Sequence, residues 1–193
     1  MADLLASIHP AKSLPPGRYG ASTQTPGVTL KRLDKAVAVL VAGRAGLSAE
    51  RAKSLGATLP EGPQRVVAGD LCVVGIGPGR WQISSDGDPD ALVEKLDAAF
   101  SPEASAFDQS GGTVQLSASG PHLPDVLAKL VALDLDPNEF SVGTAATTVT
   151  AHVGVTLWRE DDGFVFAVGR SFEPAFLRAF VQSAAEFGIA LVD

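Results

Sequence analysis

The chain has 193 residues, of which 46% are hydrophobic and 19% are charged, and its formal net charge at pH 7 is −7. This length allows one domain or two small fused halves, with enough residues to bury a substantial core. The negative charge and the lack of a basic cluster argue against a nucleic-acid or anionic-membrane partner, since phosphate groups would find no cations to engage.

Neither a secretory signal nor a membrane helix is predicted. The residues near Met1 lack the basic and long apolar segments of a signal peptide, and no apolar run approaches the roughly 20 residues that a membrane helix needs. Cys72 is the only cysteine, so no internal disulfide is expected. These features predict a cytoplasmic protein.

The first 27 residues predict an extended arm. Prolines and glycines interrupt this segment at Pro10, Pro15, Pro16, Gly17, Gly20 and Pro26. Such a segment either frays in solvent or becomes ordered against another chain. The hydrophobic composition of the whole chain shifts the interpretation toward docking on a partner.

The next segment, 28–104, predicts a first α+β half. Apolar and polar residues alternate between glycine- and proline-containing turns, which predicts strands over 28–33, 35–41, 64–68, 71–76 and 80–84. A short helix is expected over 49–55. A longer helix is expected from Pro89 or Asp90 to near Phe100, with its apolar residues on one face.

Residues 105–193 predict a second half with a similar order of elements. Strands are expected over 106–109, 113–118, 145–157 and 164–168, the third of them interrupted near His152. One helix begins around 119–121, and another runs from Ser171 to Gly188 with phenylalanines at helical spacing. Corresponding elements lie roughly 75–85 residues apart, which indicates an internal duplication. The fold is therefore predicted as α+β, an internally duplicated strand-helix-strands-helix unit with antiparallel-rich sheets and helices on one face.

A glycine-rich segment at 75–79 resembles a phosphate-binding loop. It lacks a third glycine in register and a Lys-Ser/Thr pair, and a strand rather than a helix follows it. A simple glycine turn is the better interpretation.

The histidines predict neither a metal site nor a catalytic site. His9, His122 and His152 have no metal-ligand spacing among themselves or with Cys72. His122 is expected to be exposed in the first turn of a helix, and His152 to be half-buried in a strand. The sequence has no nucleophile elbow and no calcium loop, so no catalytic residue and no metal ligand is assigned.

Four residues are candidates for an interface. A strand in each half ends near a Gly-Arg-aromatic segment, which contributes Arg80, Trp81 and Arg170. Trp158 is the other tryptophan, and both indoles are suited to packing within a sheet or interface more than to lining a ligand groove. A binding or accessory role is therefore favoured over independent catalysis.

Several motifs together resemble a known family. They are SGP at 119–121, DVLAKL at 125–130, LDLDP at 133–137, FSVG at 140–143, AHVGVTLWR at 151–159, RSF at 170–172, AAEFG at 184–188 and GPGRW at 77–81. Their order and spacing resemble the gamma subunit of heterotetrameric sarcosine oxidase, over most of residues 66–192. The resemblance implies a fold similar to the folate-binding domain of glycine-cleavage aminomethyltransferases.

The resemblance also implies a function. The chain is expected to be a non-catalytic subunit, with alpha, beta and delta subunits as partners, of a complex that oxidatively demethylates sarcosine to glycine. Hydrogen peroxide and methylenetetrahydrofolate are the other expected products, and FAD, FMN, NAD, zinc and tetrahydrofolate are expected on other subunits. Two alternatives stay open: a free-standing folate-binding or aminomethyltransferase-like one-carbon protein, and a homo-oligomeric structural protein that buries its own apolar surface.

Overall fold

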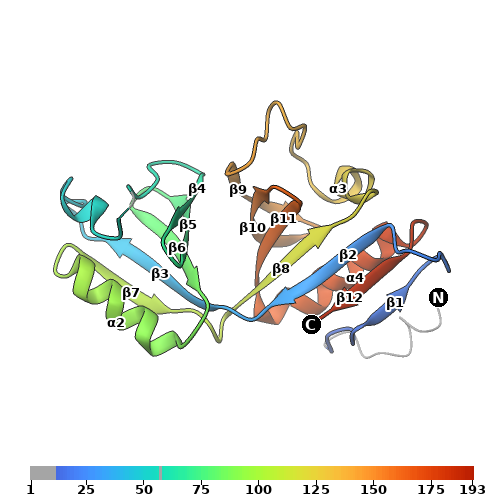
Figure 1. Ribbon diagram of the computed structural model, residues 1–193, viewed down its shortest axis with the longest axis horizontal. Helices are drawn as coiled ribbons and strands as arrows, with labels where there is room; N and C mark the ends of the chain where they lie inside the picture. Colours follow the sequence, from blue (N-terminus) through green and yellow to red (C-terminus); the bar gives the residue numbers. More distant parts are fainter. Residues whose placement is uncertain (1–11, 57) are drawn as a thin grey trace. The chain divides into compact units, whose positions relative to one another are not determined.

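Two β-sheets, each packed against helices, make up the described chain (Figure 1). The computed structural model describes residues 12–56 and 58–193. The chain divides into two compact units, each assembled from separate stretches of sequence. The first unit comprises the described residues up to Leu33 with Val114–Val142 and Thr148–Asp193, and the second comprises Asp34–Thr113 with Gly143–Thr147.

A seven-stranded sheet in the order β1-β12-β2-β8-β11-β10-β9 belongs to the first unit, apart from Thr113 in β8 and residues 145–147 in β9. Its strands are β1 (Gly17–Tyr19), β2 (Val28–Leu33), β8 (Thr113–Ser119), β9 (Ala145–Thr150), β10 (Val153–Glu160), β11 (Gly163–Gly169) and β12 (Ile189–Val192). β12 runs parallel to β2, whereas the pairs β1–β12, β2–β8 and β10–β11 are antiparallel. β10 and β11 form a hairpin whose turn contains Asp161 and Asp162, because Glu160 pairs with Gly163.

Two helices of this unit pack on each other. They are α3 (Leu123–Leu130) and α4 (Glu173–Ala184), and α4 lies against β11. The rings of Phe176 and Phe180 on α4 are buried beside Phe166 of β11, with centroids 5.4 and 5.9 Å away. Aromatic pairs at this spacing stabilise a core beyond the area that they bury.

The second unit contains a five-stranded antiparallel sheet in the order β4-β5-β6-β3-β7. Its strands are β3 (Ala36–Ala42), β4 (Arg65–Ala68), β5 (Leu71–Gly77), β6 (Arg80–Ser85) and β7 (Ala104–Asp108). Helix α2 (Pro89–Phe100), capped by Asp88, packs on β3 and β7 (Figure 1). Its predicted apolar face is confirmed, because Leu92, Leu96 and Phe100 are buried in the core of this unit.

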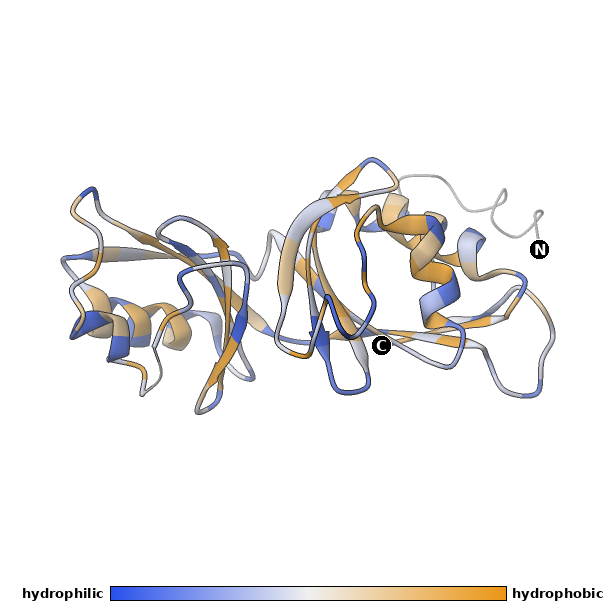
Figure 2. Ribbon diagram, turned by 90° about the horizontal axis from the view of Figure 1, so that it is seen from above, coloured by the Kyte–Doolittle hydropathy of each residue, from blue (hydrophilic) through white to orange (hydrophobic). Residues whose placement is uncertain are grey.

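The hydrophobic residues follow the strands and helices of both units, and hydrophilic residues gather at many of the connecting turns (Figure 2). The predicted α+β class with antiparallel-rich sheets is confirmed. Within residues 12–56 and 58–193, no helix is long and apolar enough to cross a lipid bilayer. The boundaries at 27/28 and 104/105 and the internal duplication stay predictions.

The glycine-rich segment at 75–79 is a close crossing of two chain segments followed by a turn. A Cβ on Gly75 would lie 2.1 Å from the carbonyl oxygen of Gly62. The N–H of Gly75 donates to the main-chain oxygen of Gln64 at 3.0 Å. Gly79, with φ of 64°, lies in the turn between β5 and β6. The prediction of a glycine turn is confirmed. At Gly75 glycine is needed because the main chain of Gly62 occupies the place that a side chain would take.

The helix predicted over 49–55 is wrong. Only a single 3-10 turn, η1 (Arg51–Lys53), forms there, and none of its residues is buried. The Ser48 hydroxyl does accept the N–H of Arg51 at 3.3 Å. A helix this short gains too little packing to offset the cost of nucleation, so this hydrogen bond alone does not extend it.

Strands β1 and β12 are not anticipated by the sequence pattern. Each is short, and the two pair with each other while β12 also joins β2. The predicted helix from Ser171 to Gly188 is shorter than expected. A 3-10 turn, η2 (Arg170–Phe172), precedes α4, which ends at Ala184. The pairings of β1 with β12 and of β12 with β2 join segments far apart in the chain, so local periodicity cannot reveal them.

Candidate interaction site

The four residues predicted for an interface divide into two pairs. Trp81 and Trp158 are buried, with 8% and 1% of their surfaces exposed. Their indole N–H groups donate within the chain, Trp81 to the Pro60 carbonyl at 2.8 Å and Trp158 to the Glu160 carboxylate at 3.2 Å. Arg80 and Arg170 are exposed, so these two arginines are the members of the set that reach the surface.

Exposure of His122 is confirmed. It lies just before α3, where its ring stacks on Phe187 with centroids 4.5 Å apart and its Nδ1 lies 3.0 Å from the Asp125 carboxylate. The ammonium of Lys129 lies 4.7 Å from the Phe187 ring centroid. These contacts join α3, at both of its ends, to Phe187 in the segment that follows α4, which is a packing role.

The placement of His152 in a strand is wrong. His152 is exposed in the two-residue turn between β9 and β10, with φ of 67°, after Ala151 with φ of 48°. Positive φ at both positions is what a two-residue hairpin of type I′ requires. His9 lies outside the described residues. Within residues 12–56 and 58–193, no group of His, Cys, Asp or Glu side chains is arranged to hold a metal ion.

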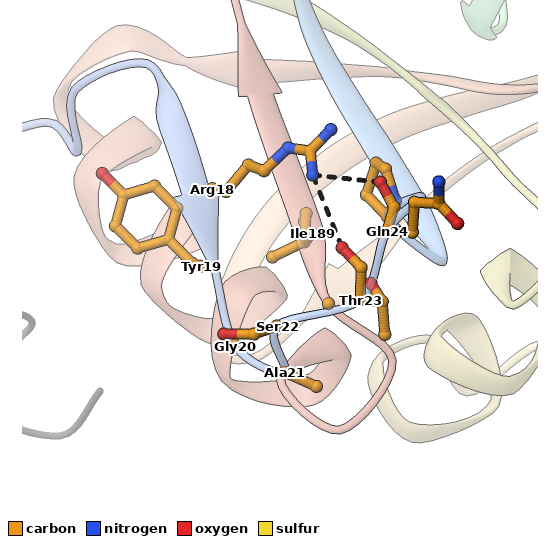
Figure 3. A pocket seen from close by; sticks show the side chains of 10 residues that line it. Arg18, Tyr19, Gly20, Ala21, Ser22, Thr23, Gln24 and Ile189 are labelled. Carbon is orange, nitrogen blue, oxygen red and sulfur yellow. Dashed lines mark hydrogen bonds between the residues drawn. The ribbon is translucent and has the colours of Figure 1, made fainter.

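One hollow, of about 380 Å³, is formed largely by the extended segment near the N-terminus (Figure 3). The guanidinium of Arg18 donates to the main-chain oxygens of Thr23 and Gln24 at 3.5 and 3.2 Å. The positive charge of Arg18, which lies in β1, therefore supports the loop that follows this strand, and the hollow forms where this loop lies beside the start of β12.

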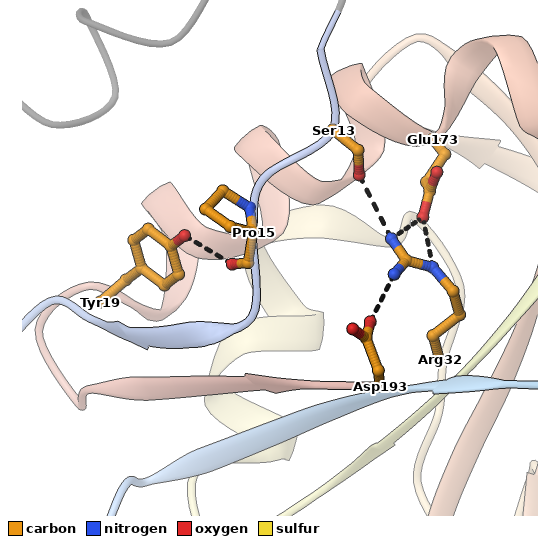
Figure 4. Close-up of polar contacts among 6 residues, drawn as sticks. All are labelled: Ser13, Pro15, Tyr19, Arg32, Glu173 and Asp193. Atoms are coloured by element: carbon orange, nitrogen blue, oxygen red, sulfur yellow. Dashed lines mark hydrogen bonds and ion pairs between the residues drawn. The ribbon is translucent and has the colours of Figure 1, made fainter.

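A group of polar contacts fixes the same segment to the first unit (Figure 4). The guanidinium of Arg32 donates to the buried carboxylate of Glu173 at 2.9 Å, to Asp193 at 2.5 Å and to the Ser13 hydroxyl at 3.3 Å. Tyr19 is buried, and its hydroxyl donates to the main-chain oxygen of Pro15 at 2.7 Å. Burial raises the pKa of this hydroxyl. The described part of the predicted arm is thus ordered against its own unit.

A second hollow, of about 370 Å³, lies within the first unit between α3, the loop that follows it, and strands β10 and β11. We call it the α3 groove, and it is lined by Pro124, Leu127, Ala128, Leu133, Asp134, Leu135, Asp136, Pro137, Arg159 and Phe164. Arg159 donates through Nη1 to the carbonyl oxygens of Leu135 and Phe140 at 3.0 and 3.2 Å. Its guanidinium carbon lies 5.2 Å from the centroid of the Phe164 ring. The groove is therefore apolar, with an arginine that holds its loop in place.

The sequence pattern alone does not identify the α3 groove as a site. Its signal is the segment LDLDP at 133–137, where leucines alternate with aspartates inside a loop rather than in a strand. Leu133 remains 39% exposed in the structure. Apolar side chains that a loop leaves at the surface are typical of a surface that another molecule covers.

The sequence matches a family model described as the sarcosine oxidase, gamma subunit family, over residues 41–186. Sarcosine oxidase subunit gamma of Corynebacterium sp. (strain U-96) is 32% identical over 155 residues, which cover 78% of this chain and 73% of that protein. The subunit of the same name from Arthrobacter sp. is 33% identical over 135 residues, which cover 68% of this chain and 64% of that protein.

Two solved structures share the fold. A chain of the heterotetrameric sarcosine oxidase from Corynebacterium sp. U-96, in complex with pyrrole 2-carboxylate, superposes with a TM-score of 0.74 at 27% identity, covering 96% of this chain and 93% of that one. The glycine cleavage system aminomethyltransferase T from Bartonella henselae superposes with a TM-score of 0.64 at 15% identity. The match covers 86% of this chain but 48% of the aminomethyltransferase, so the likeness concerns the fold alone.

Proposed function

The chain belongs to the sarcosine oxidase gamma subunit family, and from this premise we propose that it is the non-catalytic gamma subunit of a heterotetrameric sarcosine oxidase. The observation that carries the proposal is the family match over residues 41–186, which includes sheet strands and helices of both units. The structural match to a heterotetrameric sarcosine oxidase over 96% of this chain supports the same assembly.

We infer that the assembled complex converts sarcosine to glycine by oxidative demethylation, forming hydrogen peroxide and, with tetrahydrofolate, methylenetetrahydrofolate. FAD, FMN, NAD, zinc and tetrahydrofolate belong, on this proposal, to the other subunits. A supporting observation is that Arg18, Arg32 and Arg159, which line the hollows of this chain, donate to its own oxygens. Cations engaged in this way stabilise the fold rather than bind an anionic substrate.

We further propose that Arg80 and Arg170 contact the alpha, beta or delta subunits. Both side chains are exposed, and Arg170 is followed closely by Phe172, of which 57% is exposed. Arginine and aromatic residues are enriched at the centres of protein interfaces, where charged groups can pair and rings can be buried.

The test is purification of the tagged chain from its native host. Two larger chains and one small chain should co-elute, and the eluate should show a flavin absorption spectrum. A colourless chain that elutes alone would refute the proposal. Titration with tetrahydrofolate would then examine the free-standing one-carbon alternative. Light scattering would examine the homo-oligomer.

A further inference from the structure

The α3 groove presents apolar side chains on two sides. Pro124 and Ala128 lie four residues apart on one face of α3, and both are exposed. Together they form one wall of the groove. Leu133 and Pro137 are exposed on the opposite loop. The buried ring of Phe164 forms part of the lining. A groove with apolar residues on both walls suits the insertion of an apolar side chain from another molecule.

The loop side of the groove is held in position before any partner arrives. The Asp134 carboxylate accepts the N–H of Asp136 at 3.0 Å, and the Asp136 carboxylate accepts the N–H of Asn138 at 2.9 Å. Arg159 holds the same loop from the sheet through two carbonyl oxygens. A preformed surface loses little conformational entropy on binding, which favours affinity.

The charge at the edge of the groove is negative. Asp134 and Asp136 are exposed, and each uses one carboxylate oxygen in a local turn. The one arginine of the lining, Arg159, is directed toward main-chain oxygens and the Phe164 ring. A cation beside an inserted apolar side chain would therefore meet two carboxylates.

We propose that the α3 groove docks a segment of another polypeptide, which inserts one apolar side chain beside Leu133 and places a lysine or arginine against Asp134 and Asp136. The identity of that polypeptide as another sarcosine oxidase subunit rests on the proposed function. An apolar anchor with a neighbouring charge pair is the arrangement that gives protein interfaces both affinity and orientation.

The experiment co-expresses the tagged chain with the alpha, beta and delta chains and measures the amount of partner recovered. Leu133→Asp places a charge where the apolar anchor would bind, and recovery should fall about tenfold, equivalent to about 1.4 kcal/mol. Asp134→Asn with Asp136→Asn keeps the oxygens that accept the turn hydrogen bonds but removes both charges. This double variant should bind more weakly and with a smaller dependence on salt.

Two controls separate the groove from general damage. Leu133→Met preserves an apolar anchor and should recover as much partner as the wild type. Val149→Asp changes a 58% exposed valine of β9 outside the groove lining and should leave recovery unchanged. Circular dichroism of each variant should match the wild type.

A photo-reactive benzoyl-phenylalanine at position 133 identifies the occupant directly. The expected cross-link joins a partner segment that carries an apolar residue next to a lysine or arginine. If Leu133→Asp and the double variant both recover as much partner as the wild type, the groove proposal is overturned and the proposed function is left intact. A cross-link to a second copy of this chain would also overturn it. Failure of the wild type to recover any partner would instead refute the proposed function.

Discussion

The turn between β9 and β10 places two non-glycine residues in the left-handed region of backbone space. Ala151 has φ of 48° and His152 has φ of 67°, and both side chains are exposed. Each L-residue in this conformation costs roughly 1–2 kcal/mol, because its Cβ approaches the following carbonyl oxygen. Asparagine and glycine adopt it most readily, and Asn-Gly is the preferred pair in a type I′ turn.

Replacing Ala151 with Asn and His152 with Gly should therefore stabilise the first unit. Relief of strain at both positions, of about 2 kcal/mol, is offset by about 0.5–1 kcal/mol, because glycine is more flexible in the unfolded chain. The expected gain is about 1 kcal/mol in the free energy of unfolding. Urea denaturation of the isolated chain should show a higher midpoint with an unchanged m-value.

Two single variants give the controls for this turn. His152→Ala leaves a Cβ at the same φ, so the gain should be absent. Ala151→Val places a β-branched residue there and should lower the free energy of unfolding. An Asn-Gly variant that is no more stable than the wild type, or a tolerated Ala151→Val, would refute the attribution of strain to this turn.

Three further predictions concern the cores and the response to pH. Phe180→Ala removes a fully buried ring from the phenylalanine cluster and should lower the free energy of unfolding by about 3–5 kcal/mol, measured by urea denaturation. Gly75→Ala forces a Cβ against a main-chain oxygen and should lower the melting temperature, whereas Gly77→Ala, which meets no atom within 4 Å, should have a much smaller effect. The N–H of Ser48 donates to the Glu103 carboxylate and lowers the pKa of that group below its ordinary 4.5. A lowered folded-state pKa contributes stability above pH 4.5 that is lost as the pH falls through the folded pKa, so the wild type should exceed Glu103→Gln in urea midpoint at pH 7 and converge with it in acid.

Local sequence patterns were sufficient for most of the secondary structure. The strand at 28–33 matches its predicted bounds and α2 follows its predicted range, because alternation and helical periodicity reflect burial on one face. Where burial is lacking the pattern misleads, as at η1, where a helix is predicted over 49–55 and only a single 3-10 turn forms. Short pairings between distant segments, such as β1 with β12, carry no local signal.

The sequence by itself determined the α+β class, the glycine turn at 75–79 and the resemblance to the sarcosine oxidase gamma subunit. The tertiary structure decided which side chains are accessible: it buried Trp81 and Trp158, left Arg80 and Arg170 at the surface and exposed Leu133. It also formed the α3 groove, which needs α3, its following loop and two strands to converge. Periodicity depends on neighbours along the chain, whereas a groove depends on strand register and helix packing, which bring together residues that are distant in sequence.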